Sequence, residues 1–195
     1  PFDVARRGTL MGEGAAIMVL ETMDHAKQRG AKTYAEVRGT GWSCDGHHWT
    51  IPEATAKQPI VAMRRALADA GVDANTIDCV LAHGTATDQN DVMESRAIVE
   101  VFGEHAQQLW VSAIKSKLGH GGGAAGAFQA LTAALVLQHG HVPPTANLRE
   151  QDPRCEVRVA GPGPIETNPM RNVLVNSYAF GGNNTSVILG SLHNE

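Results

Sequence analysis

Three glycine-flanked turns in this sequence carry side chains that could do chemistry. The turns are AHGTATDQND (82–91), SAIKSKLGHGGG (112–123) and NSYAFGGNN (176–184). They supply two histidines, His83 and His120, together with Lys115, and a helix after the first turn adds Asp91 and Glu94. Imidazole, ammonium and carboxylate groups in one site suit the polarisation of a carbonyl and the stabilisation of an oxyanion. Glu94 could also pair with Lys115 and keep the lysine charged.

A purely structural interpretation stays open for each of these residues. A single histidine at the end of a strand is usually structural, a lone lysine is usually solvated, and clustered glycines can simply let a helix pack closely. The glycine cluster at 119–123 does not fit GxxxxGK followed by Ser or Thr, and GEG at 12–14 is not GxGxxG. The sequence therefore gives little support to nucleotide binding.

Other histidines and a cysteine lie outside the three turns. The adjacent pair His47 and His48, or the pair His139 and His141 after a helix, leaves a metal site open as a weaker alternative. Cys44 has no helix N-terminus nearby to lower its pKa, so we interpret it as inert. The long loop that contains it, predicted from about Trp42 to Lys57, is more typical of a site wall than of a plain connector.

The periodicity of apolar residues indicates alternating strands and helices. Strands are predicted at 9–20, 33–41, 79–82, 109–114, 172–177 and 185–190, and helices at 21–30, 58–71, 91–103 and 121–140. Such alternation is typical of an α/β fold, and the closing strand–turn–strand adds a hairpin, so we expect a mixed sheet flanked by helices. Functional groups of α/β sheets gather at strand ends, where all three turns lie.

Composition narrows the function classes. The 195 residues carry a net charge of −4, which argues against non-specific nucleic-acid binding. No apolar run reaches the length of a membrane span, and the N-terminus does not have the pattern of a signal peptide. Three cysteines without CxxC spacing suit a reducing compartment, so we expect a cytoplasmic protein.

Four motifs in order carry a resemblance to a known family. They are FDVARRGTLMGEGA (2–15), AHGTATDQNDVME (82–94), KSKLGHGGGAAGA (115–127) and NSYAFGGNN (176–184). The chain resembles the C-terminal half of β-ketoacyl-acyl carrier protein synthases, the condensing enzymes of fatty acid and polyketide synthesis, of the elongating type with two histidines. The resemblance implies a thiolase-like fold with α-β-α-β-α layers. It assigns residues 1–30 to the end of the N-terminal half and 31–195 to the C-terminal domain.

The resemblance also implies roles for the polar residues of the first two turns. His83 and His120 match the histidines that hold the thioester oxygen of a malonyl unit while it becomes an enolate. Lys115 and Glu94 match the lysine and glutamate that orient the histidines and tune their charge. Asp91 matches a supporting aspartate of the same catalytic group.

Substrate contacts and a gate follow from the same resemblance. Thr85 and Thr87 match the two hydroxyls that bind the phosphopantetheine arm of the acyl carrier protein. Phe180 matches the gating phenylalanine, and its turn supplies a backbone N–H to the acyl-side oxyanion hole. Gly181 and Gly182 in that turn are predicted to contact substrate. No metal or bound organic cofactor is implied.

The family's nucleophilic cysteine has no counterpart here. None of the three cysteines matches it, so the expected partners are an N-terminal half with that cysteine, an acyl carrier protein, and a second synthase subunit in a homodimer or heterodimer. Arg6 and Arg7 could contact the carrier protein or form a solvated face. The chain alone is expected to be inactive as an acyltransferase.

Two alternatives belong to other functional classes. A non-catalytic partner subunit, like the chain-length factors of polyketide synthases, would have little reason to keep both histidines and Lys115. A degradative thiolase would need a cysteine in the turn that reads YAFGGNN here, and this turn has none.

Overall fold

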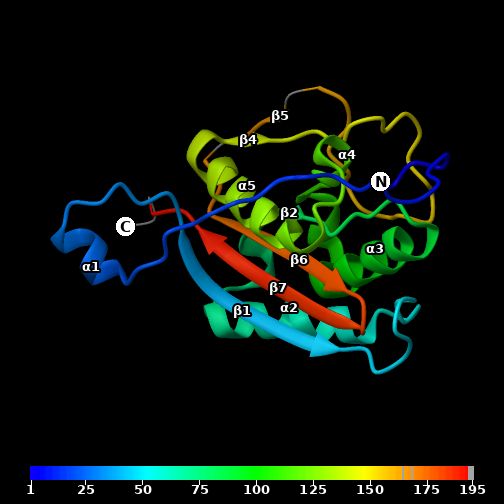
Figure 1. Ribbon diagram of the computed structural model, residues 1–195, viewed down its shortest axis with the longest axis horizontal. Coiled ribbons are helices and arrows are strands. Elements are labelled where there is room, and N and C mark those ends of the chain that lie inside the picture. Colours follow the sequence, from blue (N-terminus) through cyan, green and yellow to red (C-terminus); the bar gives the residue numbers. More distant parts are fainter. Residues whose placement is uncertain (164, 168, 193–195) are drawn as a thin grey trace.

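The centre of the protein is a five-stranded sheet, shown in Figure 1. The structure is a computed structural model that describes residues 1–163, 165–167 and 169–192. The strands are β1 (Glu36–Cys44), β2 (Ile77–Leu81), β3 (Trp110–Ser112), β6 (Asn172–Ala179) and β7 (Asn183–Gly190), in the order β1-β7-β6-β2-β3. β2 runs parallel to β3 and β6, while β7 is antiparallel to both β6 and β1. The predicted mixed sheet with a closing hairpin is confirmed.

Three helices cover the two faces of this sheet: α2 (Lys57–Ala70) and α3 (Asp88–Phe102) lie on one face and α5 (Ala125–His139) lies on the other. The shorter helices are α4 (Lys115–Leu118) and α1 (Met23–Gln28), and α1 lies apart from the sheet in Figure 1. Short 3₁₀ turns lie at Ala74–Thr76, Gly103–Gln107 and Gly122–Ala124, and β4 (His141–Val142) pairs with β5 (Ile165–Glu166). The four predicted helices all form, with shifts of a few residues at their ends.

The core divides into two apolar layers, one on each face of the sheet. α2 and α3 bury Met63, Met93 and Ile98 in one layer, and α5 buries Ala133 and Val136 in the other. α5 is apolar all the way round, which is typical of a helix buried on every side. Two leucines on its outer side, Leu131 and Leu135, are nevertheless exposed.

The prediction of a strand over residues 9–20 is wrong. This segment is extended but forms only one isolated bridge, between Met11 and His120, and is otherwise outside the sheets. Ile17 is 91 % exposed, and Val19 and Leu20 are also exposed. The apolar pattern marks an extended chain, but the pairing partner of residue 11 is a turn rather than a strand.

None of the helices in the described ranges combines the length and the apolar content that crossing a membrane requires.

Candidate active site

The three chemistry-bearing turns come together because of the sheet order. β2, β3 and β6 are parallel neighbours, so their carboxyl ends lie at the same edge of the sheet. His83 follows β2, Lys115 and His120 follow β3, and Phe180 follows β6. The sequence therefore places all three turns at one edge, as predicted.

The two histidines face each other at the centre of this edge. Their ring centroids are 5.7 Å apart and the ring planes are nearly perpendicular, at 85°. The Nδ1 atom of His83 accepts a hydrogen bond from the Tyr178 N–H at 3.2 Å, and Nδ1 of His120 accepts one from the Gly122 N–H at 3.0 Å. An Nδ1 that accepts cannot carry the proton of a neutral imidazole, so Nε2 carries it in both rings. Both side chains are thus set as hydrogen-bond donors through Nε2.

Burial and charge keep both rings neutral. Burial, the Lys115 ammonium and the neighbouring His120 hold the pKa of His83 well below its usual 6.5. Burial and the Lys115 ammonium lower the pKa of His120 as well. A neutral imidazole with its proton on Nε2 remains available as a donor at mildly acidic pH.

Lys115 and Glu94 bind the backbone of His83, one at its carbonyl and the other at its N–H. The Lys115 ammonium donates to the His83 carbonyl at 2.6 Å, and Nζ lies 3.4 Å from His83 Nδ1. The Glu94 carboxylate accepts from the N–H groups of His83 and Gly84, at 2.8 and 2.9 Å. Within the described residues the two charged groups form no direct ion pair. Instead of the expected ion pair with each other, Glu94 and Lys115 both form hydrogen bonds with the His83 backbone.

Burial also shifts the ionisation of these two supporting groups. It raises the pKa of Glu94 to about 7, against the three hydrogen bonds that the carboxylate accepts from His83, Gly84 and Asn176. It lowers the pKa of Lys115 to about 8, while the charges of Glu94 and Asp91 oppose this effect. All three hydrogen bonds run from N–H donors to the carboxylate oxygens, so they favour the ionised form of Glu94.

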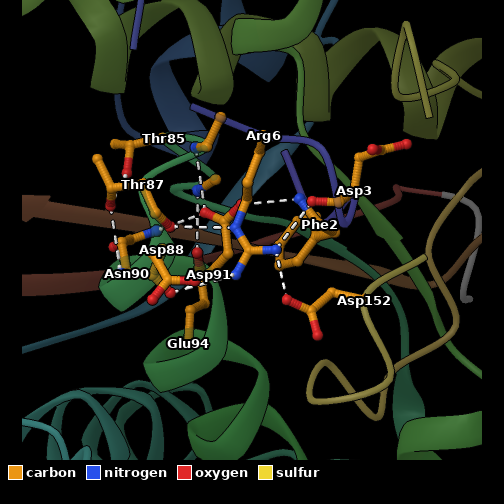
Figure 2. A network of polar contacts seen from close by, with 12 residues as sticks. Phe2, Asp3, Arg6, Thr85, Thr87, Asp88, Asn90, Asp91, Glu94 and Asp152 are labelled. Atoms are coloured by element: carbon orange, nitrogen blue, oxygen red, sulfur yellow. Dashed lines mark hydrogen bonds and ion pairs between the residues drawn. The ribbon is translucent and has the colours of Figure 1, made fainter. Parts of the chain in front are cut away.

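The structure places the Asp91 carboxylate between the N-terminal segment and the first turn. Its fully buried carboxylate accepts from the Phe2 N–H at 2.7 Å and from the Ala86 N–H at 3.1 Å, and contacts neither histidine ring. Figure 2 shows the Arg6 guanidinium beside it, with Nε 3.5 Å from Asp91 Oδ2 and NH1 2.6 Å from Asp152 Oδ2. Asp91 therefore anchors the N-terminal segment to the first turn.

The position of Arg6 corrects both sequence-based interpretations of this residue. Its side chain is only 3 % exposed and is surrounded by Asp88, Asp91 and Asp152, so it is neither a solvated charge nor a free contact for a carrier protein. Arg7, by contrast, is exposed. No local sequence signal marks this network, because Arg6 and Asp152 are 146 residues apart.

The N-terminal segment runs across both histidine turns. The Gly8 N–H donates to the Ala86 carbonyl at 2.9 Å, and the Gly12 N–H donates to the His120 carbonyl at 3.0 Å. A Cβ at residue 12 would lie 2.0 Å from the Leu118 carbonyl oxygen, so only glycine allows this approach. Residues assigned to the end of the first half thus bind directly to the turns of the second.

The two threonines of the first turn have different roles: one hydroxyl caps a helix and the other is available to a ligand. Their Oγ1 atoms are 3.1 Å apart, and both side chains are half-buried. Thr87 caps α3, because its Oγ1 accepts from the Asn90 N–H at 3.2 Å. If Thr87 also donates to Thr85, the proton of the Thr85 hydroxyl is free for a ligand.

Valine substitutions separate these roles. We expect Thr87→Val to destabilise the protein by about 1 kcal/mol, because the N-cap of α3 is lost. Thr85→Val should leave stability nearly unchanged and raise KM for a carrier-borne substrate. Thermal unfolding and steady-state kinetics measure the two effects. Equal destabilisation by both variants, or an unchanged KM for Thr85→Val, would refute this division.

The third turn exposes Phe180 next to the long loop. Phe180 is 79 % exposed, and Gly181 and Gly182 take the left-handed conformation that a tight turn requires. The Gly181 N–H donates to the Trp49 carbonyl at 2.7 Å, and the Gly182 N–H donates to Ala179. Both glycine amides are therefore occupied. Among the described residues, the Phe180 N–H has no acceptor and is the amide that this turn can offer to a ligand.

The three cysteines differ in exposure, and one of them lies beside the third turn. Cys44 is exposed and its thiol lies 3.4 Å from the Gly181 carbonyl oxygen, while Cys79 and Cys155 are buried. Burial raises the pKa of the Cys155 thiol to about 12. In the part of the chain that the structure describes, no three His, Cys, Asp or Glu side chains gather in a way that could hold a metal ion.

The sheet order and the flanking helices agree with one half of a thiolase-like fold. A comparison with protein families matches residues 34–149 to "Beta-ketoacyl synthase, C-terminal domain". The chain belongs to the β-ketoacyl synthase family.

Relatives of known name support this membership. Nodulation protein E of Rhizobium meliloti is 45% identical over 184 residues, which are 94% of this chain and 45% of that protein. The 3-oxoacyl-[acyl-carrier-protein] synthase 2 of Coxiella burnetii is 41% identical over 191 residues, covering 97% of this chain and 45% of that protein. A solved structure described as the ishigamide ketosynthase/chain length factor superposes with a TM-score of 0.93 at 46% identity, over 98% of this chain and 46% of that one. The chain spans slightly less than half the length of these relatives.

Proposed function

We propose that this chain supplies the decarboxylating half of a β-ketoacyl synthase site, in which an acyl thioester condenses with malonyl carrier protein. The observation that carries the proposal is the pair of facing, neutral imidazoles whose Nδ1 atoms both accept backbone N–H groups. Two Nε2–H donors at one edge suit a thioester oxygen on which negative charge develops.

The proposed reaction proceeds in two steps. The bond between the malonyl carboxylate and its α-carbon breaks, CO2 leaves, and the electron pair moves onto the thioester as an enolate. The enolate carbon then attacks the carbonyl of an acyl group held on the nucleophilic cysteine of the first half, and the cysteine thiolate leaves. His83 and His120 donate to the enolate oxygen, and the Phe180 N–H donates to the acyl oxygen.

The surrounding residues position the groups for this chemistry. Lys115 and Glu94 fix the peptide of His83, and the Thr85 hydroxyl binds the phosphopantetheine arm. No metal or bound organic cofactor is needed, because the two imidazoles supply the positive polarity that the oxyanion requires. Gly181 and Gly182 serve substrate binding by shaping the turn, because their own N–H groups donate to the Trp49 and Ala179 carbonyls.

Three partners follow from the proposal. A first synthase half supplies the cysteine, and residues 1–30 form its end. The exposed apolar side chains of Ile17, Leu131 and Leu135 support the proposal that this half covers a large surface of the chain. An acyl carrier protein delivers the substrate, as in a neighbouring solved structure described as a carrier protein in complex with its ketosynthase. A second synthase subunit completes a dimer. The three free cysteines suit a cytoplasmic location for this assembly.

A non-catalytic partner subunit fits the site less well. His83, His120 and Lys115 are all in place, and the hydrogen bonds that set their protonation are intact. A subunit without catalytic function would gain nothing from burying Lys115 and Glu94 at this edge.

The pH dependence of CO2 release tests the electrostatics of the site. Because burial and the Lys115 ammonium lower the pKa of both imidazoles, protonation of the histidines should not reduce the rate as pH falls through 6.5. A loss of rate near pH 7 would instead report Glu94, because burial raises the pKa of that carboxyl to about 7. In Lys115→Met one cause of the lowering is gone, so the acid limb of the profile should move to higher pH. The rate of CO2 release from malonyl carrier protein, measured between pH 5 and 8 with the matched surface variant Lys117→Met, checks this. An acid limb at the same pH in both variants would refute the charge effect.

A further inference from the structure

A single glutamine lies buried in the middle of the apolar helix α5. Gln129 is 1 % exposed, and its Nε2 group lies within hydrogen-bonding distance of three backbone carbonyl oxygens. These are Ala82 O at 2.7 Å, Asn176 O at 3.0 Å and Leu81 O at 3.2 Å. The side-chain Oε1 is buried without a hydrogen-bond partner among the described residues.

The surroundings fix which way this amide points. An exchange of N and O would turn Oε1 toward three other acceptors with no hydrogen between them. The observed orientation satisfies the carbonyls and leaves Oε1 unsatisfied, which costs free energy in a buried site. An apolar residue of similar volume would avoid the cost at Oε1 but would withdraw the donor from the Ala82 and Asn176 carbonyls. The polar group is therefore specific to the backbone carbonyls that it contacts.

Gln129 links all three turns of the candidate active site. Leu81 and Ala82 directly precede His83, and Asn176 lies two residues before Tyr178, whose N–H holds Nδ1 of His83. The helix that carries Gln129 follows the turn of His120. One amide thus joins the carbonyls at the end of β2 to the Asn176 carbonyl of the neighbouring strand β6, close to the Tyr178 N–H that keeps the His83 proton on Nε2.

We propose that Gln129 is a positioning residue that holds His83 in the tautomer with its proton on Nε2. This inference rests on the proposed function of His83 as a donor to the enolate. Gln129 does not contact the reacting atoms; it acts through the carbonyls of Leu81, Ala82 and Asn176.

The test compares two identical substitutions on the same helix in the complete enzyme, meaning this chain together with a first half. Gln129→Met keeps the volume and removes the donors, while Gln138→Met removes a glutamine that donates to the Tyr34 carbonyl, away from the strand ends. We expect Gln129→Met to lower kcat for CO2 release from malonyl carrier protein by about tenfold to a hundredfold, the size of effect that misplacement of a catalytic group produces. KM should change less than about twofold, since substrate contacts stay in place.

A second readout reports the tautomer and does not depend on activity. In ¹⁵N-histidine-labelled enzyme, the nitrogen shifts of His83 should show a proton on Nε2 in wild type and in Gln138→Met, and a mixture of tautomers in Gln129→Met. Gln129→Ala, which leaves room for water, replaces the methionine variant if thermal unfolding shows that the latter does not fold.

The possible outcomes separate this inference from the proposed function. Wild-type nitrogen shifts together with wild-type kcat in Gln129→Met would overturn the positioning role. A wild-type enzyme that releases no CO2 would refute the proposed function, and the nitrogen shifts would still decide whether Gln129 sets the tautomer.

Discussion

Alanine at His83 or at His120 is expected to lower the rate of CO2 release from malonyl carrier protein by about 10²–10³-fold, because each change removes one donor to the developing oxyanion. Each Nδ1 already accepts a backbone N–H, so each ring offers a single Nε2–H to the substrate. The complete enzyme and a coupled assay for CO2 give the rate directly.

Loading of the acyl group provides the internal control for these variants. Transfer of an acyl chain to the nucleophilic cysteine needs no enolate, so it should proceed in both variants. His139→Ala, at the exposed end of α5, controls for the loss of an imidazole. Loss of loading together with CO2 release would indicate a damaged site rather than a missing donor.

Methionine at Arg6 is expected to destabilise the protein by about 3–5 kcal/mol, the usual cost of leaving a buried charge without its partner. The guanidinium is almost fully buried and lies between Asp91 and Asp152 (Figure 2). Its removal leaves the fully buried Asp91 carboxylate with hydrogen-bond donors but without a cation. Thermal or denaturant unfolding of the complete enzyme measures the loss.

An exposed ion pair supplies the matched control for Arg6. Arg64 pairs with Glu100 at 3.1 Å with both side chains largely exposed, so Arg64→Met should cost at most about 1 kcal/mol. Arg6→Lys should recover only part of the stability, because lysine cannot reach several acceptors with one planar group. Similar stability losses in Arg6→Met and Arg64→Met would show that the buried network contributes little.

The sheet, the helices and the convergence of the turns could be predicted from the sequence. Strand and helix periodicities are local, and parallel strands bring their carboxyl ends to one edge regardless of detail. His83 and Lys115 lie directly after predicted strands, and His120 lies in the same turn as Lys115, so this rule predicts all three at the edge. The same rule gives the turn of Phe180.

Contacts between distant segments could not be predicted. Residues 9–20 have the composition of a strand, but pairing depends on partners elsewhere in the chain, and residue 11 pairs with a turn. Opposite charges on Glu94 and Lys115 suggest a pair, whereas the backbone of His83 lies between them. Gln129 did leave a signal in the sequence, an amide in the middle of an apolar helix, but periodicity alone gives it no role.

CO2 release by complete enzyme whose nucleophilic cysteine has been alkylated separates decarboxylation from condensation. If His83 and His120 stabilise the enolate, the alkylated enzyme continues to release CO2 from malonyl carrier protein and forms no ketoacyl product. Replacement of both histidines by alanine then abolishes this release. Unchanged CO2 release from the alkylated double variant would show that the enolate is stabilised elsewhere and that the function proposed for the two histidines is wrong.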